Sequence, residues 1–200
     1  KMKYLITEHT RLITKYFRLV MHEVDEDALL SESCLPNQGH NIYDAAGFCV
    51  ARVVCNGRDF EIFYTERIQW NDPSLQSWLR RTMRDNIIDI ARKVLPERLH
   101  YWEAQKGLSA LDVKVRTLRG YTLGCEGSGS IALSPMILLM PEKYMDNVIL
   151  HEMAHLKYQH HRKSFWRYLS TLLGEDACLL QGKMEADMKN FYSYFNFLLK

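Results

Sequence analysis

The apolar pattern of this 200-residue chain predicts an α+β fold, in which a small antiparallel or mixed sheet packs on helices. Three observations support this prediction. Two strand-like runs flank an Asn-Gly turn signal, short alternating segments follow residue 110, and apolar residues recur at helical spacing elsewhere in the second half. We expect an N-terminal β-containing extension at residues 1–70 and a second domain at residues 71–200.

The N-terminal extension is predicted from one β-hairpin. Phe48 to Cys55 and Phe60 to Ile68 alternate or run apolar on either side of Asn56-Gly57, which is the strongest short-range hairpin signal. Residues 3–24 mix apolar and basic residues without a clean period, and residues 25–44 are polar and typical of a loop. The sequence assigns no role to either of these two segments.

Helices and short strands are predicted to alternate after residue 71. A helix begins at Asp72-Pro73 and continues to Leu95, and a second helix follows Pro96 as far as Gly107. Two strands follow, and a glycine-bearing turn at residues 124–129 precedes the second of them. The expected later elements are strands at Leu111 to Leu118 and Ser130 to Leu133, and helices at His161 to Leu173 and about Asp176 to Leu199.

The segment His151-Glu152-Met153-Ala154-His155 is an HExxH motif inside an apolar helical run. Two histidines four residues apart on an α-helix lie about 40° apart around the axis, so both imidazoles can bind one metal ion. Glu152 emerges about 100° from His151, where its carboxylate can reach a metal-bound water without being a ligand. The motif therefore predicts a zinc site with Glu152 as general base. The alternative is two histidines on a solvated helix face with an incidental glutamate between them.

A hydrolytic zinc centre normally takes three protein ligands, so a third donor is expected. On an unbroken helix His160 would lie about 180° from His151, and His161 about 80° away on the other side. The helix should therefore end near residues 158–159, which allows His161 to reach the metal with the spacing HExxHxxxxxH. Two downstream carboxylates remain as alternative third ligands, Glu175 and Glu185.

These residues and their surroundings resemble the YgjP-like metallopeptidases, relatives of the WLM and SprT-type zincins. The family signature HELxHLxxxxHxxxFW is matched by HEMAHL at residues 151–156, by His161, and by Phe165-Trp166 at the same offsets. Upstream, CEGSGSIALS at residues 125–134 is similar to the family segment WGSCSxxGxIxLN. The resemblance covers about residues 72–184.

The resemblance implies a zincin-like metalloprotease fold, with the small sheet packed on the HExxH helix. It also implies that His151, His155 and His161 hold Zn²⁺ while Glu152 accepts a proton. Two departures from the family pattern indicate that the substrate-side lining is altered. They are Thr122-Leu123-Gly124, where the family has Trp-Gly-Ser, and Ser134, where the family has Asn.

The expected function is zinc-dependent hydrolysis of peptide bonds, with a peptide or protein as substrate. Two other functions stay open. The same centre could hydrolyse the phosphoanhydride of a nucleotide, or the zinc could belong to a non-catalytic binding module. Glu152 counts against the binding module, because a closed structural site needs no adjacent base.

Composition limits the compartment and the partners. The formal net charge is +2, which gives no reason to expect nucleic acid or an anionic membrane as partner. The five cysteines are scattered without the spacing of a zinc knuckle or the density of a disulfide scaffold, so reduced thiols are expected. No apolar stretch approaches the roughly 18 residues of a membrane span, and no signal-peptide core is found. We therefore expect a cytoplasmic protein, whose oligomeric state the sequence does not indicate.

Overall fold

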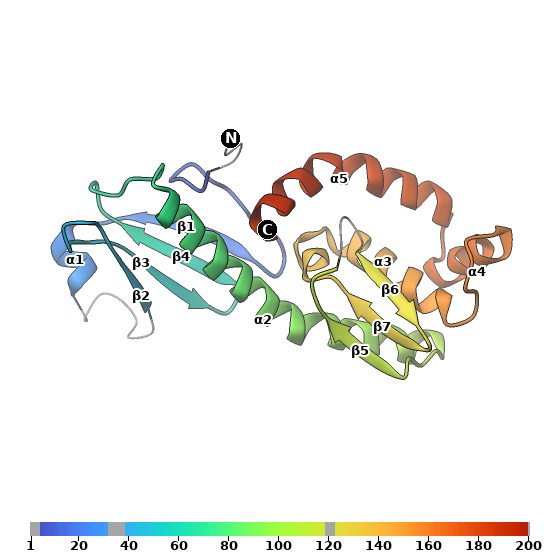
Figure 1. The fold of residues 1–200 in the computed structure, drawn as a ribbon. Helices are drawn as coiled ribbons and strands as arrows, with labels where there is room; N and C mark the ends of the chain where they lie inside the picture. Colours follow the sequence, from blue (N-terminus) through green and yellow to red (C-terminus); the bar gives the residue numbers. More distant parts are fainter. Residues whose placement is uncertain (1–4, 32–38, 119–122, 200) are drawn as a thin grey trace. The chain divides into compact units, whose positions relative to one another are not determined.

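The computed structural model describes residues 5–31, 39–118 and 123–199, and its elements form two compact units (Figure 1). The first unit contains Lys1–Asn86 with Leu198–Lys200, and the second contains Ile87–Phe197. The units divide inside one long helix, whereas the predicted boundary between residues 70 and 71 lies just before that helix. The domain boundary at 70 and 71 stays a prediction.

The first unit is built on a four-stranded sheet that contains the predicted hairpin. The sheet order is β1-β4-β3-β2, with β1 at Arg18–Glu23, β2 at Gly39–Tyr43, β3 at Cys49–Asn56 and β4 at Asp59–Tyr64. Strands β3 and β4 are antiparallel, and Asn56 pairs with Asp59, so Gly57 and Arg58 form the turn. Gly57 has a φ of 59°, a conformation that glycine adopts without steric cost. The hairpin prediction is therefore confirmed.

Two strands of this sheet were not predicted from the sequence. Strand β1 pairs parallel to β4, and β2 pairs antiparallel to β3. The expected loop at residues 25–44 contains the short helix α1 (Glu26–Leu30) as well as β2, and residues 32–38 lie outside the described residues. Both strands have only one buried face or none, so neither carries a clear apolar alternation.

Helix α2 (Pro73–Lys106) is continuous through Pro96, so the predicted break at this proline is wrong. A proline inside a helix costs about 3 kcal/mol, because it removes a hydrogen bond and crowds the preceding turn. The buried apolar face continues across the proline, however, since Leu95 and Leu99 on either side are both fully buried. Packing of that face offsets the local cost.

The second unit contains a three-stranded mixed sheet of order β5-β7-β6. Strand β5 (Asp112–Val115) is parallel to β7 (Ser130–Leu133), and β6 (Gly124–Gly127) is antiparallel to it. The turn predicted at residues 124–129 is thus a strand followed by a two-residue turn at Ser128-Gly129, where both φ values are positive, at 54° and 83°. Glycine is depleted in strands, which is why this segment resembles a turn in the sequence.

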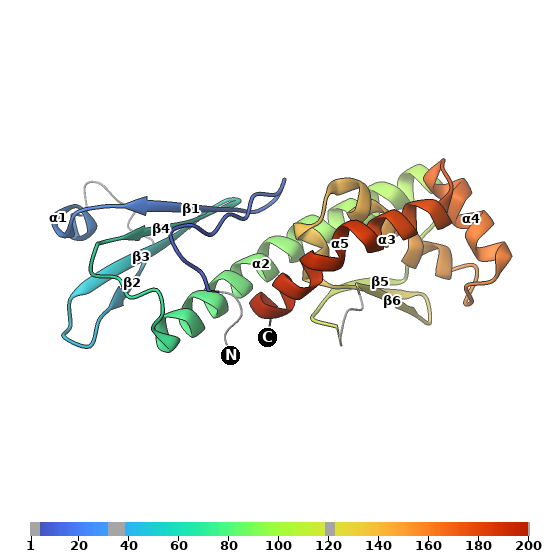
Figure 2. The same cartoon turned by 90° about the horizontal axis from the view of Figure 1, so that it is seen from above.

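Helices cover the sheet of the second unit. Figure 2 shows β5 and β6 on one side and helices α3 and α5 on the other. The 3₁₀ helix η1 lies at Pro135–Leu139, α3 at Glu142–His155, α4 at Lys163–Leu173 and α5 at Ala177–Leu199. The small sheet, the helix that carries the HExxH motif and the C-terminal helix all match the expected α+β fold. Among the described residues, no helix is long and apolar enough to cross a membrane.

Helix α3 is joined to the second half of α2 by a partly buried ion pair. Arg98 donates two hydrogen bonds to the Asp146 carboxylate, at 2.7 Å and 2.6 Å. The indole N–H of Trp102 donates a third hydrogen bond to Asp146, at 2.9 Å. These three hydrogen bonds to one carboxylate hold the two helices at a defined spacing.

We predict that Asp146→Ala lowers the free energy of unfolding by about 2 kcal/mol, because it removes the acceptor of two hydrogen bonds from a partly buried guanidinium and of one from an indole N–H. Urea unfolding followed by circular dichroism measures this change. Asp89→Ala is the matched control. Asp89 pairs with Arg92 at 3.5 Å on the exposed face of α2. The control should cost less than about 0.5 kcal/mol, and equal losses in the two variants would contradict the assignment.

Candidate metal centre

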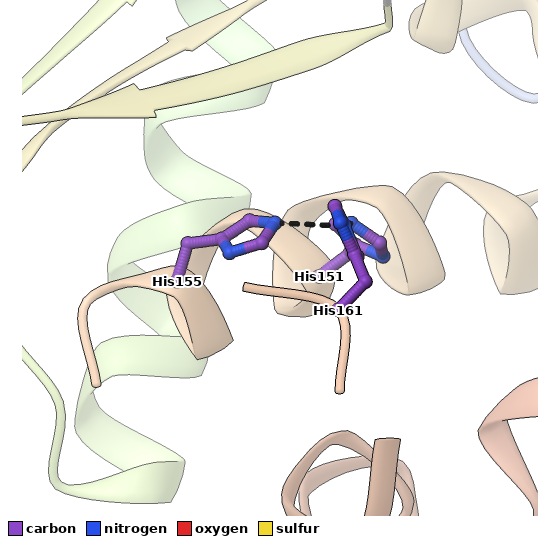
Figure 3. Close-up of side chains that lie close together, drawn as sticks. All are labelled: His151, His155 and His161. Atoms are coloured by element: carbon purple, nitrogen blue, oxygen red, sulfur yellow. Dashed lines mark hydrogen bonds between the residues drawn. The ribbon is translucent and has the colours of Figure 1, made fainter. Parts of the chain in front are cut away.

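Three histidine side chains converge at the C-terminal end of α3 (Figure 3). His151 and His155 lie on the last turns of the helix, and His161 lies in the connection to α4. The His161 Nε2 atom is 2.9 Å from the Nε2 of His151 and 3.1 Å from the Nε2 of His155. The structure therefore brings together the three histidines that the sequence predicts as metal ligands.

The turn after α3 makes this convergence possible. The helix ends at His155, three residues before the predicted end, and Leu156 is its C-cap. The backbone N–H of Tyr158 still donates to the carbonyl of Ala154, at 3.0 Å, so the chain makes one tight turn before it leaves the helix axis. His161 can then approach the imidazoles from outside the helix, which an unbroken helix would not allow.

The donor geometry fits a divalent metal ion such as zinc. In a tetrahedral site with Zn–N bonds of about 2.0–2.1 Å, ligand nitrogens lie about 3.3–3.4 Å apart, within a few tenths of an ångström of the two separations above. The candidate ligand atoms of His151, His155 and His161 all lie within 4.8 Å of one another. Among the described residues, no other His, Cys, Asp or Glu group of three or more has this arrangement.

The surroundings keep two of these imidazoles neutral, which is the form that binds metal. Burial, with a smaller contribution from the nearby His155 and His161, lowers the pKa of His151 to about 3. The pKa of His161 is also lowered, mainly by burial. At neutral pH both rings therefore keep a free lone pair for a cation.

A backbone carbonyl orients the third imidazole. The Nδ1 of His155 lies 2.8 Å from the carbonyl oxygen of Tyr158. Because a carbonyl oxygen only accepts, the proton must be on Nδ1, and the lone pair on Nε2 then faces the other two histidines. The sequence does not reveal this contact, since any residue at position 158 supplies the same carbonyl.

Phe165 forms the apolar base of the histidine cluster. Its ring is fully buried, and its centroid lies 4.6 Å from that of His155, 4.9 Å from that of His151 and 4.8 Å from that of His161. The rings of Phe165 and His155 are stacked. In the sequence Phe165 is part of the family signature, and the structure adds direct contact with all three imidazoles. An apolar wall of this kind restricts the orientation of the rings and the access of water.

The acidic residue of the motif directly follows His151 and is shielded from bulk solvent. Glu152 is on α3, which packs against β6 and β7, and only 6% of the residue is exposed. Its three neighbours along the helix, Met153, Ala154 and Leu150, are buried as well. The packing of the helix on the sheet therefore holds the Glu152 side chain in a buried position.

The other residues considered as ligands lie outside the cluster. Glu175 accepts a hydrogen bond from Lys143 at 2.9 Å, and Glu185 accepts one from Gln181 at 2.8 Å. His160 accepts a hydrogen bond from the backbone N–H of Arg162 at 3.3 Å through Nδ1. Within the described part of the chain, His161 is thus the third donor that the geometry supports.

Ser134 has a structural contact that its sequence position does not reveal. The residue is buried, and its hydroxyl accepts a hydrogen bond from the backbone N–H of Met136, at 3.3 Å. It thereby caps η1, the short helix that leads to α3. The other departure from the family pattern is described in part, because Thr122 lies outside the described residues while Leu123 and Gly124 are within them.

We predict that Phe165→Leu weakens zinc binding about tenfold, because it removes the ring that contacts all three imidazoles while keeping the site apolar. A competition titration with a chromophoric chelator measures the affinity. Phe17→Leu is the control, since Phe17 is equally buried but belongs to the first compact unit. A control that loses as much affinity as Phe165→Leu would show a general loss of stability instead.

The chain was compared with families and with known proteins. A model of the family described as YgjP-like, metallopeptidase domain, matches residues 61–177. Among solved structures, the chain is similar to the metallopeptidase zymogen of Pyrococcus abyssi, abylysin, with 25% sequence identity and a TM-score of 0.41, over 48% of this chain and 96% of that chain. No curated protein matches the chain. The family match spans more than half of the sequence, so this chain belongs to the YgjP-like family and contains its metallopeptidase domain.

Proposed function

We propose that this protein is a zinc peptidase in which His151, His155 and His161 hold the metal and Glu152 is the general base. The observation that carries the proposal is the convergence of three Nε2 atoms beside a buried glutamate that follows the first histidine directly. Membership of the metallopeptidase family supports the class of reaction. The ring nitrogens of histidine suit zinc among the common divalent ions.

Each group then has a defined part in peptide hydrolysis. A bound zinc ion supplies Lewis acidity, which lowers the pKa of a water molecule to about 7 and polarises a carbonyl oxygen. The Glu152 carboxylate accepts the proton of the attacking water and then transfers it to the nitrogen of the leaving amine. The protonated amine departs as the C–N bond breaks. The buried position of Glu152 keeps this proton transfer away from bulk water.

The number of ligands supports a catalytic centre over a structural one. Structural zinc sites are closed by four protein ligands, whereas hydrolytic sites use three and leave one position for water or substrate. The cluster in the described residues holds three donors. The buried carboxylate beside it has no function in a closed site, which further favours hydrolysis.

We predict that Glu152→Gln keeps one zinc per chain but lowers kcat at least 10²-fold, because the amide cannot accept a proton. His155→Ala should lose both zinc and activity. Metal analysis and cleavage of a fluorescence-quenched peptide library measure the two quantities. Parental turnover in Glu152→Gln would reject the role of Glu152, and phosphate release from a panel of nucleotides without peptide cleavage would reject the peptidase assignment.

The identity of the third ligand has its own test, because two histidines are adjacent. We predict that His161→Ala lowers zinc affinity at least 10²-fold, since it removes one of three donors, while His160→Ala leaves the affinity within about twofold. Chelator competition at pH 7.5 measures both. The reverse order of effects would assign the third position to His160.

A further inference from the structure

Strand β6 approaches the HExxH helix most closely at Gly124. A Cβ atom added to Gly124 would lie 2.6 Å from Cγ, 2.8 Å from Oε1 and 2.9 Å from Cδ of Glu152. Carbon atoms in contact prefer separations of about 3.5–4.0 Å, so a side chain at this position would overlap the glutamate. All three of the nearest atoms belong to Glu152, and none belongs to a histidine of the cluster.

The backbone itself does not require glycine at this position. Positive φ values are found at five other glycines of the described chain, and Gly124 is not among them. An alanine could therefore adopt the same backbone conformation without strain. What the glycine provides is space, and the space is filled by the side chain of Glu152.

The surrounding packing prevents a simple escape from this contact. Met153 and Ala154, the next residues on α3, are fully buried, and Leu133, which pairs with Gly124 across the sheet, is fully buried too. The helix and the strand cannot move apart from each other without opening the core. A methyl group on Gly124 would therefore be accommodated by rotation of the Glu152 side chain.

We propose that Gly124 is a positioning residue for the general base: its missing side chain determines where the Glu152 carboxylate lies relative to the three histidines. This inference rests on the role of Glu152 in the proposed function. A displacement of about 1 Å at a reacting group can cost about 10²-fold in rate. A methyl group at position 124 should therefore reduce turnover without removing the metal.

The first test compares two alanine substitutions on the same strand. Gly124→Ala should lower kcat about 10-fold to 100-fold, with one zinc per chain and KM within about twofold of the parent. Gly127→Ala is the matched control, because a Cβ there meets no atom within 4 Å and the backbone φ is not positive. The control should keep parental kcat and KM.

Three results of this comparison would overturn the inference. They are parental kcat in Gly124→Ala, a rise in KM without a fall in kcat, and loss of zinc from Gly124→Ala. The second would show that the methyl group obstructs substrate, and the third that it displaces the histidines.

A second test does not depend on activity. Glu152→Ala removes all three atoms that the added methyl group would meet, so Gly124→Ala should lower the Tm of the parent but not the Tm of Glu152→Ala. Thermal unfolding of the parent, the two single variants and the double variant measures this coupling. If Gly124→Ala alone fails to fold, the double variant should regain the fold. An equal Tm loss in both backgrounds would overturn the inference.

The two tests separate this inference from the proposed function. If the parent cleaves no peptide, or if Glu152→Gln keeps parental turnover, the proposed function fails. The unfolding cycle still decides whether Gly124 sets the place of the Glu152 side chain.

Discussion

The convergence of the three histidines depends on the end of helix α3 at His155. If the helix continued, His161 would lie on another face and about 15 Å farther along the axis than His151. The tight turn that follows brings the Nε2 of His161 within about 3 Å of both other imidazoles. The carbonyl of Tyr158 lies in this turn. It also accepts the hydrogen bond from Nδ1 that sets the tautomer of His155. Local backbone geometry and ligand chemistry are therefore coupled in one short segment.

The elements around α3 hold this segment from several sides. Asp146 joins the helix to α2. The hydroxyl of Tyr144 donates a hydrogen bond to Asp187 on α5, and this hydrogen bond raises the pKa of Tyr144. The Asn147 amide donates to Gln181 of the same helix at 3.1 Å. These polar contacts fix the helix from the side of α2 and α5, and β6 closes on it at Glu152. The proposed general base thus lies on a helix that is held from several sides, as precise chemistry requires.

The apolar contacts of the candidate centre explain why the pKa values of His151 and His161 are lowered. Phe165 begins the buried face of α4 and at the same time touches the three imidazoles. Desolvation by such neighbours disfavours protonated histidine, which is the direction of the pKa shifts at His151 and His161. His151 and His161 can therefore offer a lone pair to a metal ion at neutral pH. The same wall limits the entry of water from the side of the core.

The sequence alone determined the features that depend on local spacing. The β3–β4 hairpin follows from its turn signal, and the choice of the three histidines and Glu152 as candidate site residues follows from the HExxH spacing and the family resemblance. Tertiary packing decided the rest: α2 continues through Pro96 because its buried face continues, and a glycine-rich segment becomes β6 because β7 pairs with it. The contacts of Phe165, the Tyr158 carbonyl and Gly124 with the site also come from packing. These contacts join residues that no periodicity relates, so only the folded chain brings them together.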